Sequence, residues 1–343
     1  MATDADVVVV GAGIMGASAA RAMARAGRGV VVLERFEVGH RRGSSHGASR
    51  IFRLSYDDPT FVRMAQKALP LWRDLEEEAG EAVLTTTGGL DVGDGAVANA
   101  VALEVCGVHH ERMTATEAEE RFPVFSLPAD APVLYQADAG IVHADAAWRA
   151  FVRSARDHGA ELRERTPAVR LERVDDGVRV HTDGSSIGAS VAVVTAGAWA
   201  RELLATAGID LPVTATRETA AYFALDEPLP PTLVQWERVP YYALPNPGKG
   251  IKAAQHHAGP VTDPNEDGPV SEEAVARLSA WVKERFPGAD PEPHTAETCL
   301  YTNTADEHFI MDRRGPIVIG SACSGHGFKF ASLVGERLAA LAA

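Results

Sequence analysis

The sequence predicts an α/β protein with two interleaved domains, and three features lead to this prediction. The chain has 343 residues, which is more than one hydrophobic core ordinarily holds, so about two domains are expected. A β-branched run, a glycine-rich turn and an alanine-rich stretch follow one another within residues 7–34 and indicate a β-α-β unit. No single linker divides the chain, which indicates that the domains exchange segments.

The composition excludes several classes of protein. Hydrophobic residues make up 46% of the chain and charged residues 23%, as in an ordinary globular protein rather than a disordered, collagen-like or coiled-coil one. The net charge is −14, from 33 Lys and Arg against 47 Asp and Glu. Because such a surface repels phosphate groups, we expect neither a nucleic-acid nor a membrane partner.

Cysteine content and the absence of targeting signals indicate the compartment. Three cysteines (Cys106, Cys299 and Cys323) cannot form a disulfide framework, and their spacing matches no zinc site, so no metal is expected. The N-terminus has no basic leader, and no apolar stretch approaches the roughly 18 residues that cross a bilayer. We therefore expect a cytoplasmic protein in a reducing compartment.

The first elements form the β-α-β unit. Residues 7–10 are all valine and predict a strand buried on both faces, as in a parallel sheet. A glycine-rich turn over 11–16 precedes a helix that reaches about Arg25. A second strand over 30–33 ends at Glu34.

The next segment contains helices with recognisable starts. Asp58 and Pro59 suit the cap and first position of a helix that reaches about Glu78, and Pro70 is expected to kink or split it. Residues 85–140 predict short strands and one helix, which begins at a capping box over 114–117. The later expected elements are a helix over 144–158, hairpin turns at 176–177 and 183–184, a strand over 191–195, a strand-rich segment over 213–300 with a helix at 271–286, a strand over 317–320, a glycine-rich turn over 324–327 and a terminal helix.

The turn after the first strand matches the dinucleotide fingerprint G-x-G-x-x-G. Gly11 permits a tight turn, Gly13 lets the backbone approach a pyrophosphate, and Gly16 lets helix and strand pack closely. Glu34, 18 residues after Gly16, can accept hydrogen bonds from ribose hydroxyls. The alternative is an α/β turn that binds no nucleotide. FAD and NAD both use this fingerprint, so it leaves the chemistry open.

Four further segments carry a resemblance to a known family. They are GSSHGASRIFR at 43–53, TAGAW at 195–199, CLYTNTADEHFI at 299–310 and SGHGFKF at 324–330. In order and spacing they resemble the monomeric sarcosine oxidase and N-methyltryptophan oxidase family of flavin-dependent amine oxidases, over nearly the whole chain. The resemblance implies a Rossmann-type FAD-binding domain interleaved with a smaller β-sheet substrate domain. We expect the first over 1–84, 145–212 and 302–343, and the second over 85–144 and 213–301.

The resemblance also implies the cofactor and its contacts. Cys299 matches the cysteine through which the family attaches FAD by a thioether to a flavin methyl group. The alternative is that Cys299 packs as a small hydrophobic residue, as expected of the other two cysteines. The positions that match FAD contacts are Gly11, Gly13, Ile14, Met15, Gly16, Glu34, Arg35, Ser44, His46, Arg50, Val169, Gly197, Trp199, Cys299, Gly325, Gly327, Phe328 and Lys329.

Arg53 and Lys329 match the family's anchors for the substrate carboxylate. An amino acid carboxylate in a poorly hydrated pocket needs charge-assisted hydrogen bonds, which these side chains can donate. Their alternative role is that of solvated surface cations. Tyr242 matches a tyrosine of the substrate pocket, and its alternative role is packing.

The remaining matches concern catalysis. Lys252 matches the lysine that promotes reaction of reduced flavin with dioxygen, and a cation there would stabilise developing negative charge. His256 matches an active-site histidine, whereas the adjacent His257 is expected to be exposed. The last three matches are His46 and Arg50 near the flavin and Tyr301 in the pocket, and all three could instead serve packing.

The resemblance implies oxidation of sarcosine or another N-methyl amino acid to an imine, with dioxygen reduced to hydrogen peroxide, by a monomer. The alternatives are an oxidase of cyclic imino acids like proline or pipecolate, a flavin dehydrogenase with another acceptor, and a non-catalytic cofactor-binding protein.

The sequence departs from the family pattern at several positions, most of them near the expected substrate pocket. The segment before Tyr242 is short, Lys252 follows Pro245 early, Cys323 and Gln255 replace bulkier types, and the chain ends sooner than expected.

Overall fold

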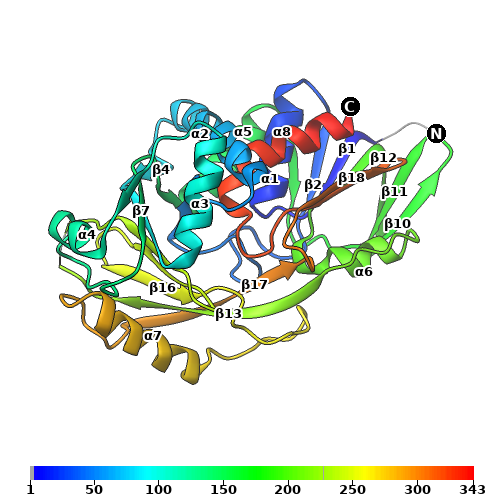
Figure 1. The fold of residues 1–343 in the computed structure, drawn as a ribbon. Coiled ribbons are helices and arrows are strands. Elements are labelled where there is room, and N and C mark those ends of the chain that lie inside the picture. Colours follow the sequence, from blue (N-terminus) through cyan, green and yellow to red (C-terminus); the bar gives the residue numbers. More distant parts are fainter. Residues whose placement is uncertain (1–3, 227) are drawn as a thin grey trace.

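A computed structural model describes residues 4–226 and 228–343 (Figure 1). Residues 1–3, where no basic leader is expected, and residue 227 lie outside the described residues. The first sheet is centred on β1 (Ala5–Val10), which pairs in parallel with β2 (Val30–Leu33) and β12 (Ser185–Val194). Val7 to Val10 are buried, as the apolar run predicts. The other strands of this sheet are β9 (Glu161–Arg163), β10 (Ala168–Val174), β11 (Gly177–Thr182), β18 (Ile310–Arg314) and β19 (Ile317–Ser321).

Four helices pack together on one face of this sheet. They are α1 (Ile14–Arg25), α2 (Pro59–Ala79), α5 (Ala144–Asp157) and α8 (Ala331–Ala342), and Figure 1 shows α1 and α8 side by side. Among them, α2 packs against the other helices rather than against the strands of the sheet. The small residues of α1 allow this contact, since a Cβ at Gly335 of α8 would lie 2.1 Å from Ser18 Oγ. The short helix α6 (Ala200–Ala205) packs on β10.

Pro70 was predicted to kink or split its helix, and it does not split it, because α2 is one continuous helix that contains Pro70. The kink stays a prediction. Phe61 and Val62 before the proline, and Trp72 and Leu75 after it, are buried in the same hydrophobic core. Burial of each such side chain contributes about 2 kcal/mol, so together they outweigh the roughly 3 kcal/mol that an interior proline costs a helix.

A second, mostly antiparallel sheet lies beside the first. Its strand order is β17-β13-β16-β15-β14-β5-β7-β6, and α7 (Glu272–Arg285) covers its far face (Figure 1). Its strands are β5 (Gly89–Val92), β6 (Glu111–Met113), β7 (Val133–Gln136), β13 (Thr214–Phe223), β14 (Thr232–Gln235), β15 (Tyr241–Pro245), β16 (Ile251–Gln255) and β17 (Thr295–Asn303).

The prediction of a single helix within 85–140 is also wrong. The capping box at Thr114 begins α4 (Ala115–Arg121) as predicted, but α3 (Asp94–Val105) precedes it. The sequence of α3 lacks an apolar–polar period because its valines at 97, 101 and 105 are exposed, while its alanines at 96, 100 and 102 are buried. The pattern that ordinarily indicates a surface helix is therefore missing.

A small sheet joins the regions around the site. It consists of β3 (Ser49–Phe52), β4 (Leu84–Thr86) and β8 (Gly140–His143), and β3 carries the end of the 43–53 segment. Two single-turn 3₁₀ helices, Gly197–Trp199 and Phe328–Phe330, follow β12 and the glycine-rich turn. These sheets and helices confirm the predicted α/β fold class, whereas the division into two domains stays a prediction. Among the described residues, no helix combines the length and apolar character needed to span a bilayer.

Candidate functional site

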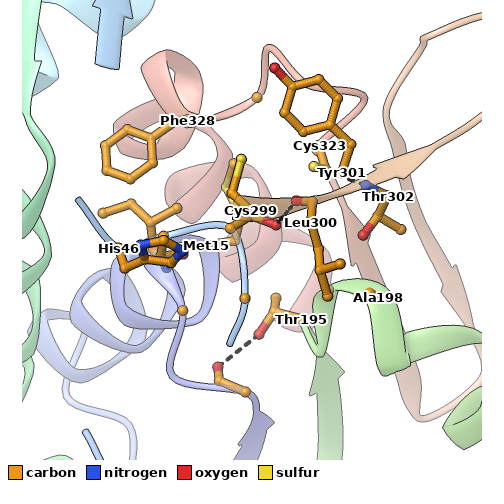
Figure 2. Close-up of a pocket in the computed structure, with 18 of the residues that line it drawn as sticks. Met15, His46, Thr195, Ala198, Cys299, Leu300, Tyr301, Thr302, Cys323 and Phe328 are labelled. Carbon is orange, nitrogen blue, oxygen red and sulfur yellow. Dashed lines mark hydrogen bonds between the residues drawn. The ribbon is translucent and has the colours of Figure 1, made fainter. Parts of the chain in front are cut away.

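One cavity of about 690 Å³ brings the predicted site residues together. Its lining contains every residue predicted to contact FAD, substrate or dioxygen, with the single exception of Gly16. Figure 2 shows Cys299 in the middle of part of this lining, with Met15 and His46 on one side and Tyr301 on the other. The structure thus collects these residues from segments far apart in the chain, while their individual roles stay predictions.

Gly16 lies beneath the turn instead of lining the cavity. A Cβ there would lie 1.8 Å from the carbonyl oxygen of Gly11 and 2.7 Å from Thr195 Oγ1, so only glycine fits. The Thr195 hydroxyl in turn donates to the carbonyl oxygens of Val10 and Gly11 at 3.0 and 3.1 Å. This close packing places the N-terminus of α1 against the cavity, where its N–H groups can bind an anion.

Glu34 lies at the end of β2 with its side chain nearly buried. Its carboxylate accepts from the backbone N–H of Ala12 at 2.8 Å and of Phe36 at 2.9 Å. Burial opposes its ionisation, but His40 and these two N–H groups outweigh burial and lower the pKa of the carboxyl group below its usual value. A carboxylate held in this way keeps lone pairs for ribose hydroxyls.

Aromatic and small residues form the neighbouring part of the lining. The Arg35 guanidinium lies 5.7 Å from the centroid of the Trp199 ring, which itself contacts Phe36 edge-on. Gly197 and Val169 line the same cavity. Arg35, Trp199, Gly197 and Val169 are predicted to contact FAD.

The 43–53 segment folds around the side chain of Arg50. Its guanidinium donates to the carbonyl oxygens of Ser49, Ser44 and His46 at 2.9, 3.0 and 2.6 Å. His46 is only 7% exposed, and neither of its ring nitrogens has a hydrogen-bond partner within the described chain. Burial, followed by the charge of Arg50, lowers the pKa of His46 to about 4. A neutral imidazole whose nitrogens lack partners can form a hydrogen bond with a polar group of a cofactor bound in the cavity.

Cys299 is on β17 and has no disulfide partner. Burial raises the pKa of its thiol, while Arg50 and Lys252 act in the opposite direction. Cys323 also lines the cavity, but its sulfur accepts a hydrogen bond from the backbone N–H of Thr302 at 3.3 Å. Cys323 and Cys106 are partly exposed rather than fully buried.

Lys252 reaches the cavity from β16 with a side chain that is 5% exposed. Its ammonium lies 3.6 Å from Glu297 Oε1. Burial, with a contribution from Arg50, lowers the pKa of Lys252 to about 8, and Cys299 and Glu297 oppose that shift. The site therefore contains a lysine whose charge changes near neutral pH.

Two cations, Arg53 and Lys329, converge on the ring of Tyr56. The Arg53 guanidinium lies 4.5 Å from the Tyr56 centroid, and Lys329 Nζ lies 5.5 Å from it. Lys329 Nζ donates to the carbonyl oxygen of His326 at 2.8 Å. Burial, followed by the charge of Arg53, lowers the pKa of Lys329 well below its usual value. An anionic ligand would relieve this repulsion.

Sequence analysis did not identify the partners of Arg53. Asp91 Oδ1 lies 3.2 Å from Arg53 Nη1 and accepts from Trp236 Nε1 at 2.7 Å and from Asn99 at 3.1 Å. Trp236 lines the cavity, with its centroid 5.1 Å from the Arg53 guanidinium. The only local sign of this pairing in the sequence is Asp91 itself, a charged residue within the otherwise apolar strand 89–92.

His256, Tyr242 and Tyr301 complete the cavity near these cations. Burial, with the charges of His257, His326, Arg53 and Lys329, lowers the pKa of His256 well below its usual value. Burial raises the pKa of Tyr242 to about 12 and holds the pKa of Tyr301 well above its usual value. A neutral imidazole and two neutral phenols therefore border two cations.

The prediction that His257 is exposed is wrong. Its side chain is half-buried, and its Nε2 atom lies 3.7 Å from Glu307. A left-handed backbone at His257, with φ of 56°, turns the ring back beside His256. Possible ligand atoms of His256, His257 and Glu307 lie within 4.8 Å of one another, so the absence of a metal stays a prediction.

Gly325 permits the close approach of the glycine-rich turn to this part of the cavity. Its φ of 71° favours glycine, and a Cβ would lie 2.2 Å from the Tyr301 ring. Gly327 and Phe328 of the same turn line the cavity. With the α1 terminus and the unpartnered His46 ring, this glycine-lined cavity fits an elongated dinucleotide such as FAD.

Comparison with known proteins agrees with this geometry. Residues 6–341 match the model of a family described as FAD dependent oxidoreductase. The chain is 32% identical to the monomeric sarcosine oxidase of Bacillus sp. (strain NS-129), over 100% of this chain and 94% of that protein. It is 33% identical to the peroxisomal sarcosine oxidase of Homo sapiens, over 97% of this chain and 90% of that protein. The open form of NikD, an unusual amino acid oxidase essential for nikkomycin biosynthesis, superposes with a TM-score of 0.89 at 28% identity, covering 98% and 93% of the two chains. The chain therefore belongs to the FAD dependent oxidoreductase family.

Proposed function

We propose that the protein oxidises the secondary amine of sarcosine or another N-methyl amino acid to an imine, with dioxygen as the electron acceptor. One observation carries the proposal. The cavity that fits FAD also contains two convergent cations, Arg53 and Lys329, and a separate buried lysine, Lys252. Two relatives are named sarcosine oxidase, which supports this substrate class.

The two cations bind the substrate carboxylate. Arg53 can donate through its planar fork and Lys329 through its ammonium, and hydrogen bonds of this kind are strong in a poorly hydrated pocket. The Arg53 guanidinium contacts the rings of both Tyr56 and Trp236, at 4.5 and 5.1 Å from their centroids. The anchor is therefore rigid, which orients the substrate.

The same residues favour a neutral amine. Arg53 and Lys329 repel a substrate ammonium. The imidazole of His256 is neutral and does not offset this repulsion. Loss of the proton gives nitrogen the lone pair that stabilises the developing iminium. The residues lining the pocket thus promote the reactive state without an assigned base.

The FAD would be held by the residues of the 11–16 turn, Glu34 and the 324–328 turn. When bound, FAD supplies the chemistry that accepts two electrons from the amine and passes them to dioxygen. Lys252 then places a cation where negative charge develops on oxygen. We propose further that Cys299 holds FAD through a thioether.

The test is peroxide release by the purified protein in air, across sarcosine, larger N-methyl amino acids, proline and pipecolate. We expect a clear signal with N-methyl amino acids. Preference for the cyclic members would instead identify an imino acid oxidase. No peroxide, together with bleaching of the flavin by substrate without air, would identify a dehydrogenase. Failure of every amine to bleach it would reject the proposal.

Replacement of Cys299 by alanine tests the thioether. In the unmodified protein, yellow colour should stay with the acid precipitate, whereas in Cys299→Ala it should pass into the supernatant. Cys323→Ala is the matched control, because that thiol lines the same cavity yet should leave the flavin attached. Colour that remains in the Cys299→Ala precipitate would contradict the linkage.

The proposed partners are a small amino acid and dioxygen. A monomer is supported by the name of the Bacillus relative, monomeric sarcosine oxidase. A cytoplasmic location remains a prediction from the cysteine content of the chain.

A further inference from the structure

Within the described part of the chain, Glu297 is the carboxylate that forms an ion pair with the ammonium of Lys252, and no sequence motif assigned it a role. It precedes Cys299 by two residues on β17, so both side chains are expected on the same face of the sheet. Glu297 Oε1 lies 3.6 Å from Lys252 Nζ, and the Tyr222 hydroxyl donates to the same oxygen. Its other oxygen pairs with Arg41 and lies 3.7 Å from His46 Nδ1.

This carboxylate separates the cofactor cavity from a second cavity. Lys252 and His46 line the cofactor cavity, whereas Glu297, Tyr222 and Arg41 line a cavity of about 890 Å³ on the other side. The Glu297 side chain is 14% exposed. Its charge is therefore poorly screened on the side of Lys252.

Of the other groups around Lys252, Arg50 favours loss of its proton, whereas Cys299 acts in the same direction as Glu297 but is a thiol whose pKa is raised by burial. The 41–50 segment contributes Arg41, His46 and Arg50, β13 places Tyr222 opposite Lys252, and β17 contributes Cys299. The remaining neighbour strand, β15, places Leu244 opposite Lys252. Burial opposes ionisation of Glu297, but Lys252, Tyr222, His46 and Arg41 together hold its pKa below the usual value. Glu297 is thus an anion at neutral pH.

We propose that Glu297 is a positioning residue for the oxygen reaction, whose carboxylate keeps Lys252 protonated and aimed into the cofactor cavity. This inference rests on the proposed oxygen role of Lys252. If Glu297 served only to form the ion pair with Arg41, its replacement would change the stability of the protein and would leave the oxygen reaction unchanged. The two possibilities differ in how the oxygen reaction depends on pH.

The experiment measures reoxidation of the flavin by dioxygen after reduction with dithionite, so that no amine substrate is needed. In the unmodified protein, the ammonium of Lys252 is present at low pH, and the rate should fall as the pH rises through about 8. In Glu297→Gln the Lys252 pKa loses the support of its paired carboxylate, so this midpoint should move down by about one unit. At pH 8 the variant should then reoxidise about fivefold more slowly, because the protonated fraction falls from about one half to about one tenth.

Two variants act as controls in the same measurement. Glu297→Asp keeps the charge and should return the midpoint most of the way to that of the unmodified protein. Lys252→Arg keeps its charge at all these pH values, so its rate should show no fall near pH 8. Flavin reduction by the amine should change less than twofold in Glu297→Gln.

A second readout needs no catalysis. The unfolding midpoints of Glu297→Gln, Lys252→Met and the double variant form a cycle, and a paired carboxylate and ammonium should make the two effects non-additive. Additive effects, or an unshifted pH midpoint in Glu297→Gln, would overturn the inference.

The outcomes also distinguish this inference from the proposed function. If no amine reduces the flavin, the proposed substrate class is rejected, while the dithionite experiment still tests Glu297. If Lys252→Met slows reoxidation but Glu297→Gln leaves the midpoint unshifted, the oxygen role stands and the role of Glu297 is rejected. If Lys252→Met reoxidises normally, both are rejected.

Discussion

Lys252→Met should slow reoxidation of the reduced flavin by at least about a hundredfold, the scale of losing one preorganised charge partner for a developing anion. Methionine fills a similar volume without the charge, so the cavity should keep its shape. Reduction of the flavin by the amine should change only a few-fold, because Arg53 and Lys329 hold the substrate. Stopped-flow mixing measures each half-reaction separately.

Lys249→Met is the matched control. It makes the same chemical change three residues away, at an exposed position outside the cofactor cavity. Both half-reactions should stay as they are in the unmodified protein. Equal slowing of reduction and reoxidation in Lys252→Met would indicate a distorted cavity and would remove the oxygen role.

The parts of the fold that sequence analysis predicted well depend on local signals. The valine run of β1, the glycines of the 11–16 turn and the capping box at Thr114 each specify their geometry within a few residues. Helix α3 was missed because its exposed valines remove the expected period. Pro70 does not split α2, because the burial that stabilises this helix comes from the rest of the fold.

The predicted site residues came from motifs, and their charge partners could not be found in the same way. Asp91 lies 38 positions from Arg53, and Glu297 lies 45 positions from Lys252. Pairing between such distant positions depends on the order of strands in the sheet, where β13 lies between β16, which carries Lys252, and β17, which carries Glu297. The two-residue spacing of Glu297 and Cys299 was a local sign that both belong to one face.

Arg53→Met should lower kcat/KM for the N-methyl amino acid by about a hundredfold or more, and it should also destabilise the protein. The first effect follows because two charge-assisted hydrogen bonds to the carboxylate are worth about 3 kcal/mol or more together. The second follows because Asp91, which is only 3% exposed, would lose its cation. Breaking one side of a buried pair costs about 3–5 kcal/mol of unfolding free energy.

The double variant Arg53→Met with Asp91→Asn separates these two roles. Asparagine still accepts from Trp236 Nε1 through its carbonyl oxygen but carries no charge, so most of the lost stability should return in denaturant unfolding. The kcat/KM should stay low, since no guanidinium has been restored. Arg42→Met, at an exposed surface pair with Asp267, should change stability by less than about 1 kcal/mol and leave kcat/KM unchanged. Recovery of kcat/KM in the double variant would mean that Arg53 acts only by neutralising Asp91, and that the carboxylate is bound by Lys329 alone.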